Sequence, residues 1–432
     1  MTGATDKRPT ELANSAKQRR WHTRTHGAPQ GQNVADSYLS PGVQIALLTG
    51  CADQPYALGL ASALISEGIF LDFIGSDQVD GPVLHDTSQV NFLNLRRDQS
   101  LEAGFVRKAS RVLAYYLRLV RYAATSERKI FHILWNNKFE FIDRTVLMLY
   151  YRLLGKRIAF TAHNVNAGAR DSNDSLINRL SLRIQYRLSG HMFVHTNKMK
   201  SELVTEFGVP DHKVTVIPFG INNTVPNTDL TTVEAKRILG VRESDKTILF
   251  FGNIAPYKGL EYLISAFGEV AKNSAAYRLI IAGRPKGCEH YWNEIQDRIR
   301  QNCACERVIE RIEYIPDEKV ELYFKGADVL VLPYTHIYQS GVLFLGYSFG
   351  LPVIAADVGS LKEDIIEGKT GFAFKSRDSI DLAKTIHEYF SSNLFRNLPN
   401  LRKEIRNFAN ERNSWSKVGE LTKKAYSQLM EQ

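Results

Sequence analysis

The chain has 432 residues, of which 44% are hydrophobic and 23% charged, a composition typical of a globular protein with two domains. No apolar run reaches the roughly 18 residues of a membrane span, and no apolar signal-peptide core lies near the first residue, so we expect a cytoplasmic protein. Four cysteines are too few for a disulfide scaffold of this size, and their spacing fits no usual zinc pattern.

The formal net charge of +9 is concentrated in one segment of the N-terminal half. Residues 101–160 contain twelve Lys or Arg and four Asp or Glu. Within this segment, 105–123 alternates apolar and basic residues at helical spacing. That pattern is typical either of a helix lying on an anionic membrane surface or of a solvated helix face with a basic bias. We expect no nucleic acid partner, because no stacking platform or recognised nucleic-acid module accompanies the basic residues.

In chain order, residues 1–40 have almost no apolar periodicity and are predicted to be a disordered basic tail. A first domain is predicted for 41–231, where buried-strand patterns alternate with helical patterns. This alternation predicts a parallel, doubly wound α/β sheet. The predicted strands are 44–48, 70–74, 92–95, 130–134, 157–162, 192–195 and 214–218.

Polar side chains follow several of these strands. Gly50 lies in the turn after the first strand, where no G-x-G-x-x-G indicates a dinucleotide. Trp135 and Asn136 follow the fourth strand, and His163 and Asn164 follow the fifth. Since the carboxyl ends of parallel strands share one sheet edge, these residues are candidates for a substrate cleft. Histidine suits proton transfer at neutral pH, although a lone histidine at a strand end is more often structural.

A second α/β domain is predicted for 232–408, where further strand and helix patterns alternate. The predicted strands are 247–252, 278–283, 308–314, 328–332, 352–356 and 371–374. Residues 409–432 are predicted to form a final helix, whose apolar stripe indicates core packing.

Two loops of this domain have the character of phosphate-binding turns. The first follows a buried strand and places Lys258 beside a glycine, so that a point charge and a closely approaching backbone meet. The second contains Gln339, Ser340 and Gly341 and precedes a helix predicted at 342–349, whose first N–H groups and dipole suit a diphosphate. Taken alone, the second loop also fits an ordinary βαβ unit without a ligand.

Four segments of the second domain carry a family resemblance: FFGNIAPYKGLEYLISAF, IIAGRP, VLPY and QSGVLFLGYSFGLPVIAADVGSLKE. Together they resemble the donor-binding domain of the retaining GT-B glycosyltransferases of glycosyltransferase family 4 (glycosyl transferases group 1). The resemblance implies two Rossmann-like, doubly wound domains facing each other across a cleft, with the final helix crossing back to the first domain. It also implies transfer of a sugar, with retention, from a nucleotide-sugar to a hydroxyl of a glycan or lipid-linked acceptor in polysaccharide or glycoconjugate synthesis. A peripheral position on the inner membrane face fits this role.

The resemblance also assigns residues. The donor-binding candidates are Gly50, Gly252, Asn253, Lys258, Gly283, Arg284, Gln339, Ser340, Gly341, Val342 and Glu363. The catalytic candidates are His163, Lys258 and Gln339, and weaker candidates on the acceptor side are Trp135, Asn136 and Asn164. No D-x-D motif occurs, so we expect neither a metal nor a cofactor, and positive charge must come from side chains and helix dipoles.

Two positions depart from the family pattern. Ile337 and Leu345 stand where many members carry glutamates, the first of which contacts the donor sugar. This departure leaves open a non-catalytic partner subunit that keeps the donor fold, and a GT-B epimerase or phosphorylase is a further alternative. We favour the transferase because the phosphate-contacting loops are intact. The sequence identifies neither the sugar, the nucleotide, the acceptor nor the oligomeric state.

Overall fold

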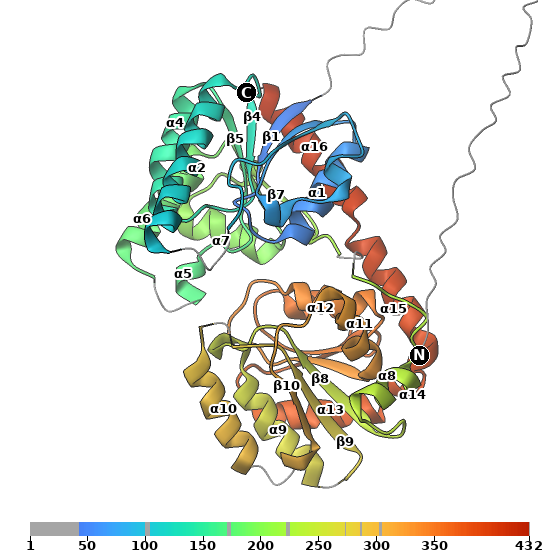
Figure 1. Ribbon diagram of the computed structural model, residues 1–432. Helices are drawn as coiled ribbons and strands as arrows, with labels where there is room; N and C mark the ends of the chain where they lie inside the picture. Colours follow the sequence, from blue (N-terminus) through green and yellow to red (C-terminus); the bar gives the residue numbers. More distant parts are fainter. Residues whose placement is uncertain are drawn as a thin grey trace, which may run out of the picture. The chain divides into compact units, whose positions relative to one another are not determined.

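The computed structural model describes residues 43–99, 104–170, 174–221, 225–272, 274–285, 287–301 and 305–431 (Figure 1). They belong to one compact unit, Pro41–Gln432. The tail predicted for 1–40 lies outside the described residues. In the part of the chain that is described, no helix is long and apolar enough to cross a bilayer.

The first sheet is parallel and has the strand order β3-β2-β1-β4-β5-β6-β7. Its strands are β1 (Gln44–Leu48), β2 (Phe70–Ile74), β3 (Val90–Leu93), β4 (Ile130–Ile133), β5 (Arg157–Thr161), β6 (His191–Val194) and β7 (Val214–Val216). Every residue of β4 and β6 is buried, as expected for strands covered on both faces. Each predicted strand of the first domain overlaps an observed one, and the doubly wound α/β fold is confirmed.

The helices of the first domain begin at recognisable caps. In α1 (Gln54–Ser66), the Asp53 carboxylate accepts a hydrogen bond from the Tyr56 N–H at 3.2 Å. In α7 (Asn197–Phe207), Thr196 caps the first turn and Gly208, at φ 69°, ends the helix. The remaining longer helices are α2 (Phe105–Thr125), α4 (Met148–Leu153) and α6 (Leu176–Leu188). The helix predicted at 105–123 is therefore confirmed as α2.

The second sheet is also parallel, in the order β10-β9-β8-β11-β12-β13. Its strands are β8 (Lys246–Phe251), β9 (Tyr277–Ala282), β10 (Val308–Arg311), β11 (Val329–Leu332), β12 (Val353–Ala356) and β13 (Gly371–Phe374). The helices that follow β8 and β11 are α9 (Leu260–Lys272) and α12 (Gly341–Ser348). Thus α12 begins one residue earlier than predicted, and Gly350, at φ 66°, follows its end.

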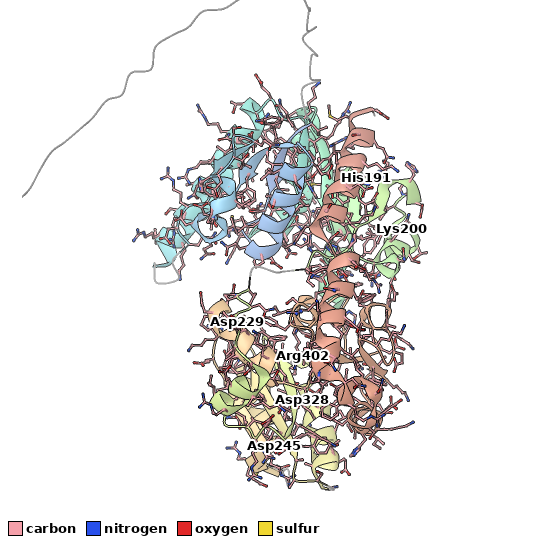
Figure 2. The ribbon with its side chains drawn as sticks, turned by 90° about the vertical axis from the view of Figure 1, so that its right-hand side faces the viewer. His191, Lys200, Asp229, Asp245, Asp328 and Arg402 are labelled. Atoms are coloured by element: carbon pink, nitrogen blue, oxygen red, sulfur yellow. The ribbon has the colours of Figure 1, made fainter. Side chains whose placement is uncertain are left out.

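A buried polar cluster ties the C-terminal helices to this sheet. Asp328 accepts hydrogen bonds from the Lys236 ammonium at 2.9 Å and from the Thr247 N–H at 2.8 Å. Arg402, on α15 (Leu398–Arg412), donates to the Ala327 carbonyl at 2.6 Å (Figure 2). Because buried charges are costly unless they are paired, this cluster fixes the start of β11 against α15.

The last helix, α16 (Trp415–Glu431), packs on α1 although it follows the second domain in sequence (Figure 1). A Cβ atom on Gly59 or Gly220 would lie within 2.5 Å of the Trp415 ring, so glycine is required at both positions. Further along the helix, the Tyr426 hydroxyl lies 2.5 Å from His132 Nδ1 beneath β4. The final helix thus closes the core of the first domain.

Candidate functional site

Aromatic rings gather at the carboxyl edge of the first sheet. The imidazole of His163, after β5, stacks on the Trp135 ring, with centroids 4.1 Å apart and planes 2° from parallel. His163 Nδ1 lies 3.1 Å from Nε2 of His195, which follows β6. The Tyr56 ring meets His163 edge-on at 4.6 Å. Three neighbouring strand ends and the start of α1 therefore form one aromatic cluster around His163.

The hydrogen bonds of this cluster fix the protonation of His163. His195 Nδ1 lies 3.3 Å from the Ile217 carbonyl, which can only accept, so this nitrogen carries the proton. Burial lowers the pKa of His195 to about 4, so its Nε2 is unprotonated at pH 7 and accepts from His163 Nδ1–H. Burial is the largest cause that lowers the pKa of His163, well below its usual value. His163 is therefore neutral, with its lone pair on Nε2.

That Nε2 atom is buried and has no hydrogen-bond partner within the described ranges. A buried acceptor left unpaired costs free energy, about 1–3 kcal/mol, unless a ligand completes it. The arrangement therefore suits acceptance of a hydrogen bond from a bound hydroxyl group, and it does not suit donation of a proton.

Glycines shape the corresponding edge of the second sheet. Gly283 has φ 147°, and a Cβ atom there would lie 1.8 Å from the Gly252 carbonyl oxygen. Gly259 has φ 64°, and its Cβ would lie 2.0 Å from the Pro333 carbonyl oxygen. Because only glycine avoids these clashes, the loops after β8, β9 and β11 can approach one another closely.

Lys258 lies beneath the loop that precedes α12. Its side chain is buried, with the residue 6% exposed, and its ammonium lies 2.6 Å from the Tyr334 hydroxyl and 4.1 Å from the ring centroid. Burial raises the pKa of Tyr334, so the hydroxyl stays neutral and accepts. Ser340 Oγ also donates to this hydroxyl, at 3.3 Å. The structure thus joins the lysine to the loop through Tyr334.

The start of α12 is open. Ser340 precedes the helix, but its side chain makes no capping hydrogen bond, because it turns to Tyr334. The first N–H groups of a helix have no intrahelical acceptor, so those of Gly341 and Val342 are left for a ligand. Next to them, Gln339 Oε1 is buried and has no hydrogen-bond partner among the residues described.

The remaining donor-side candidates are more exposed. Asn253 is exposed, and the Arg284 guanidinium lies over the Tyr314 ring at 5.2 Å. Glu363 is exposed, and its carbonyl accepts from the Arg412 guanidinium at 2.9 Å. A cavity of about 460 Å³ brings Glu363 and Gln339 together with His195. Lys258 is not among the residues that line this cavity.

Two candidates on the first sheet, Asn136 for the acceptor and Gly50 for the donor, have structural partners. Asn136 exchanges amide hydrogen bonds with Gln185 of α6, the shorter at 2.7 Å. Gly50 has φ 58°, and its carbonyl accepts from Arg96 Nη1 at 2.9 Å. A Cβ atom on Gly50 would lie 2.6 Å from the Trp135 carbonyl oxygen. Asn164, which follows His163 in the chain, is half-buried.

Two residues of the site were not singled out from the sequence. Tyr334 ends the VLPY segment, but nothing local indicates that its hydroxyl receives both Lys258 and Ser340. Arg96 belongs to an Arg-Arg pair just after a predicted strand. That position at a strand end is the sequence feature that could have identified it. In the described ranges, no group of three or more His, Cys, Asp or Glu is placed to hold a metal ion.

Family models match both halves of the chain. The model described as Glycosyltransferase Family 4 matches residues 54–224, and the model described as Glycosyl transferases group 1 matches residues 245–392. The first match contains the His163 cluster, and the second contains the loops of Lys258 and Ser340.

Relatives among curated proteins are distant. An uncharacterized glycosyltransferase of Methanocaldococcus jannaschii is 26% identical over 244 residues, which are 55% of this chain and 59% of the relative. A D-inositol 3-phosphate glycosyltransferase of Corynebacterium diphtheriae is 25% identical over 245 residues, 54% of this chain and 56% of the relative. The matched region thus spans little more than half the length of these relatives.

Solved structures with a similar fold cover nearly all of this chain. Sucrose-phosphate synthase from Thermosynechococcus elongatus has a TM-score of 0.71 at 17% identity, covering 90% of this chain and 99% of that one. HepE of Anabaena, solved in complex with UDP-glucose, has a TM-score of 0.66 at 15% identity. The match covers 90% of this chain and 99% of HepE. At these identities the likeness shows the fold, which is that of two-domain GT-B proteins.

Proposed function

The chain belongs to glycosyltransferase family 4 (glycosyl transferases group 1), and from this we propose that it transfers a sugar from a nucleoside-diphosphate sugar to a hydroxyl group of an acceptor. The observation that carries the proposal is the uncapped start of α12. Its free N–H groups and helix dipole favour a diphosphate, and they lie in the segment that the donor-domain model matches.

The second sheet would stabilise the departing nucleoside diphosphate. Negative charge builds on the leaving phosphate oxygens as the bond to the sugar breaks, and donors already fixed in place stabilise that charge without reorganising. The N–H groups of Gly341 and Val342 supply such donors. Lys258 adds positive charge from beneath the loop, and Tyr334 holds its ammonium in position.

The first sheet would hold the sugar. His163 Nε2 accepts from a sugar hydroxyl, which completes the one acceptor that the aromatic cluster leaves unpaired. Ile337 and Leu345, which replace the glutamates of other members, are partly buried and pack against the second core. The sugar contact made by the first of those glutamates, at the position of Ile337, therefore passes to Gln339, whose side-chain oxygen also has no hydrogen-bond partner within the described ranges.

The proposal includes retention of anomeric configuration without a metal ion, with the leaving phosphate taking the proton of the acceptor hydroxyl. Family membership supports this part of the proposal. The anomeric coupling constant of the purified product measures whether the configuration is retained. Activity should also persist in the presence of a chelator. An inverted product would contradict it.

An exposed apolar surface favours an acceptor that is presented at a membrane. Large apolar side chains of α2, the segment 139–154 and α6 are exposed; among them, Val106 is 80% and Leu153 is 78% exposed. Tyr150 links this segment to α2 through a hydrogen bond to the Val120 carbonyl at 3.2 Å. Basic residues interleave with these side chains, a combination that suits an anionic lipid surface. Co-sedimentation with anionic but not with neutral vesicles is expected.

The test of the donor site is a thermal-shift panel of UDP, GDP and ADP. UDP comes first, because HepE of similar fold is solved with UDP and with UDP-glucose. A nucleotide at a hundred times its Kd stabilises the fold by about 2.7 kcal/mol, which raises Tm by several degrees. No shift with any nucleotide would contradict the proposal. A shift without sugar transfer or donor hydrolysis would point to a non-catalytic partner subunit.

The variant His163→Ala separates binding from transfer. It should bind the nucleotide as the parent does, since the diphosphate lies on the other sheet. It should lower kcat by roughly a hundredfold, which is the effect of misplacing the bound sugar by about 1 Å. His212→Gln, an exposed residue, is the control.

A further inference from the structure

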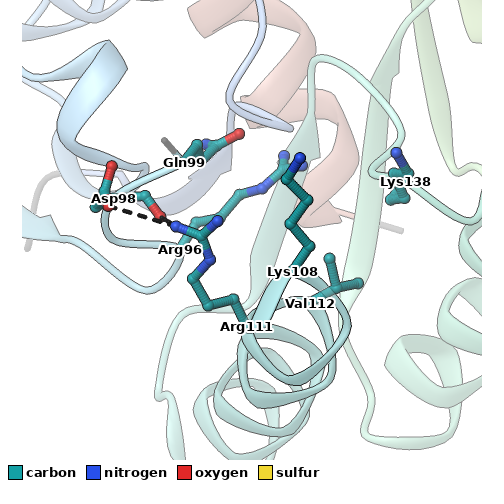
Figure 3. Close-up of a pocket in the computed structure, with 7 residues that line it drawn as sticks. All are labelled: Arg96, Asp98, Gln99, Lys108, Arg111, Val112 and Lys138. Carbon is teal, nitrogen blue, oxygen red and sulfur yellow. Dashed lines mark hydrogen bonds and ion pairs between the residues drawn. The ribbon is translucent and has the colours of Figure 1, made fainter. Parts of the chain in front are cut away.

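A small basic pocket lies in the first domain, apart from the aromatic cluster. It has a volume of about 170 Å³ and is lined by Arg96, Asp98, Gln99, Lys108, Arg111 and Lys138 (Figure 3). Arg96 and Gln99 belong to the loop after β3, Lys108 and Arg111 to the first turns of α2, and Lys138 to the loop after β4. Three separate segments therefore bring positive side chains to one hollow.

The lining of this basic pocket is strongly biased toward donors. Four of its side chains are cations, and one, Asp98, is an acid. Asp98 pairs with Arg111, whose guanidinium lies 3.4 Å from its carboxylate and 3.1 Å from its carbonyl (Figure 3). In the described part of the chain, no carboxylate lies within 4 Å of the charged groups of Arg96, Lys108 or Lys138. Within the described ranges, the positive charge of the pocket is therefore only partly neutralised, by Asp98.

The amide of Gln99 adds a second, independent observation. Its Nε2 atom is buried in the pocket wall and has no hydrogen-bond partner among the residues described. A buried amide donor without a partner is rare in folded proteins and costs about 1–3 kcal/mol. An oxygen-rich anion bound here would offset the repulsion between the like charges and accept from the unpaired amide. It would do so through several charge-assisted hydrogen bonds.

The pocket is joined to the site through Arg96. One guanidinium nitrogen donates to the Gly50 carbonyl at 2.9 Å, and its carbon lies 5.5 Å from the Tyr115 ring centroid. Gly50 in turn lies against the backbone of Trp135, the residue whose ring stacks on His163. The pocket therefore opens at the same sheet edge as His163. The uncapped start of α12 belongs to the other sheet.

We propose that the basic pocket binds a phosphate or diphosphate group of the acceptor substrate. This inference rests on the proposed function, in which the donor diphosphate occupies the second sheet and leaves the first to the acceptor. Arg96, Lys108 and Lys138 contact the phosphate oxygens, and Gln99 donates its free amide hydrogen. The phosphate anchors the acceptor, so that its hydroxyl group reaches the sugar held near His163.

Inorganic pyrophosphate, added with saturating UDP, tests the pocket. UDP fills the donor site, so any further binding of pyrophosphate must occur elsewhere. Isothermal titration should show pyrophosphate binding to the parent protein, weakened roughly tenfold or more in Lys108→Ala/Lys138→Ala because two charged donors are lost. Arg121→Ala, which removes an exposed arginine of the same helix, should bind as the parent does. Both replaced lysines are exposed, and melting without ligand checks the fold of each variant.

The two sources of a phosphate group are distinguished by vesicles. Neutral vesicles carrying a lipid monophosphate should bind the parent more tightly than plain neutral vesicles, and the double variant should lose this difference if the acceptor is lipid-linked. If only soluble phosphate compounds show the difference, the acceptor is a free phosphorylated molecule. Either result supports the binding of a phosphate group in the basic pocket.

The outcomes also separate this inference from the donor assignment. UDP binding with no pyrophosphate binding, or with equal pyrophosphate binding in the double variant, overturns the acceptor pocket and leaves the donor site standing. Pyrophosphate binding without any nucleotide binding overturns the proposed function. In steady-state assays, the double variant should raise the acceptor KM and leave the donor KM unchanged.

Discussion

The two sheets present different kinds of surface at their carboxyl edges. The edge of the second sheet is built from backbone, with Gly259 and Gly283 packed too closely for any Cβ atom and with helix N–H groups left open. The edge of the first sheet is built from side chains, with stacked rings around His163 and cations around the basic pocket. Backbone N–H groups fit the diphosphate that many nucleotide-sugars share. Side chains, by contrast, fit the shape and charge of one particular acceptor substrate.

The largest expected effect comes from breaking the backbone edge. In Gly283→Ala, the new Cβ would lie 1.8 Å from the Gly252 carbonyl oxygen, and φ is 147°. We expect a loss of about 3 kcal/mol or more in the free energy of unfolding, since strain and a backbone clash add. Nucleotide binding should fall with it, because the loops after β8 and β9 must separate. Urea denaturation measures the loss.

A matched control lies four residues away. Gly287 also has positive φ, at 72°, but a Cβ atom there would meet nothing within 4 Å. Gly287→Ala should therefore cost only about 1 kcal/mol, the cost of the left-handed conformation alone. Equal losses in the two variants would show that the close approach of β8 and β9 does not matter.

The first domain, which carries the side-chain edge, should be the more sensitive to acid. Burial lowers the pKa of His132 to about 3, and those of His191 and His195 to about 4. Unfolded histidine titrates near 6.5, so between these values the unfolded chain binds more protons than the folded chain. Stability should therefore be full above about pH 6.5 and fall as the pH falls toward 4. Each histidine contributes about 2 kcal/mol to the loss at pH 5.

Replacing one histidine isolates its contribution to the loss of stability in acid. His132→Gln should reduce the drop in unfolding free energy between pH 7 and pH 5 by about 2 kcal/mol, although the variant is less stable at pH 7. His132 bonds to Tyr426 of α16, so undocking of this helix should accompany the acid transition. An unchanged pH dependence in the variant would show that His132 is protonated in the folded state.

The same contrast explains what the sequence could predict. The buried strands and the glycine-rich donor loops are local patterns, and the structure contains each strand near its predicted range. The side-chain contacts depend on residues far apart in sequence: Arg96 reaches Gly50 across 46 positions, and Lys258 reaches Tyr334 across 76. No local pattern reports such pairs. Asn136 illustrates the limit, since its strand-end position suggested a substrate contact while its amide pairs with Gln185.

The smallest effect concerns Tyr334, a side chain that supports the backbone edge. Tyr334→Phe removes the hydroxyl that accepts from Lys258 and Ser340, with little change in volume. We expect a loss of about 1 kcal/mol in stability and nucleotide binding roughly three- to tenfold weaker, because the ammonium loses one acceptor and the loop before α12 loses its anchor. The charge itself is kept, so the effect reports positioning alone. Lys258→Met, which removes the charge, should weaken nucleotide binding further. If Tyr334→Phe binds UDP as the parent does while Lys258→Met does not, the lysine acts without Tyr334, and the backbone edge needs no side chain to hold it.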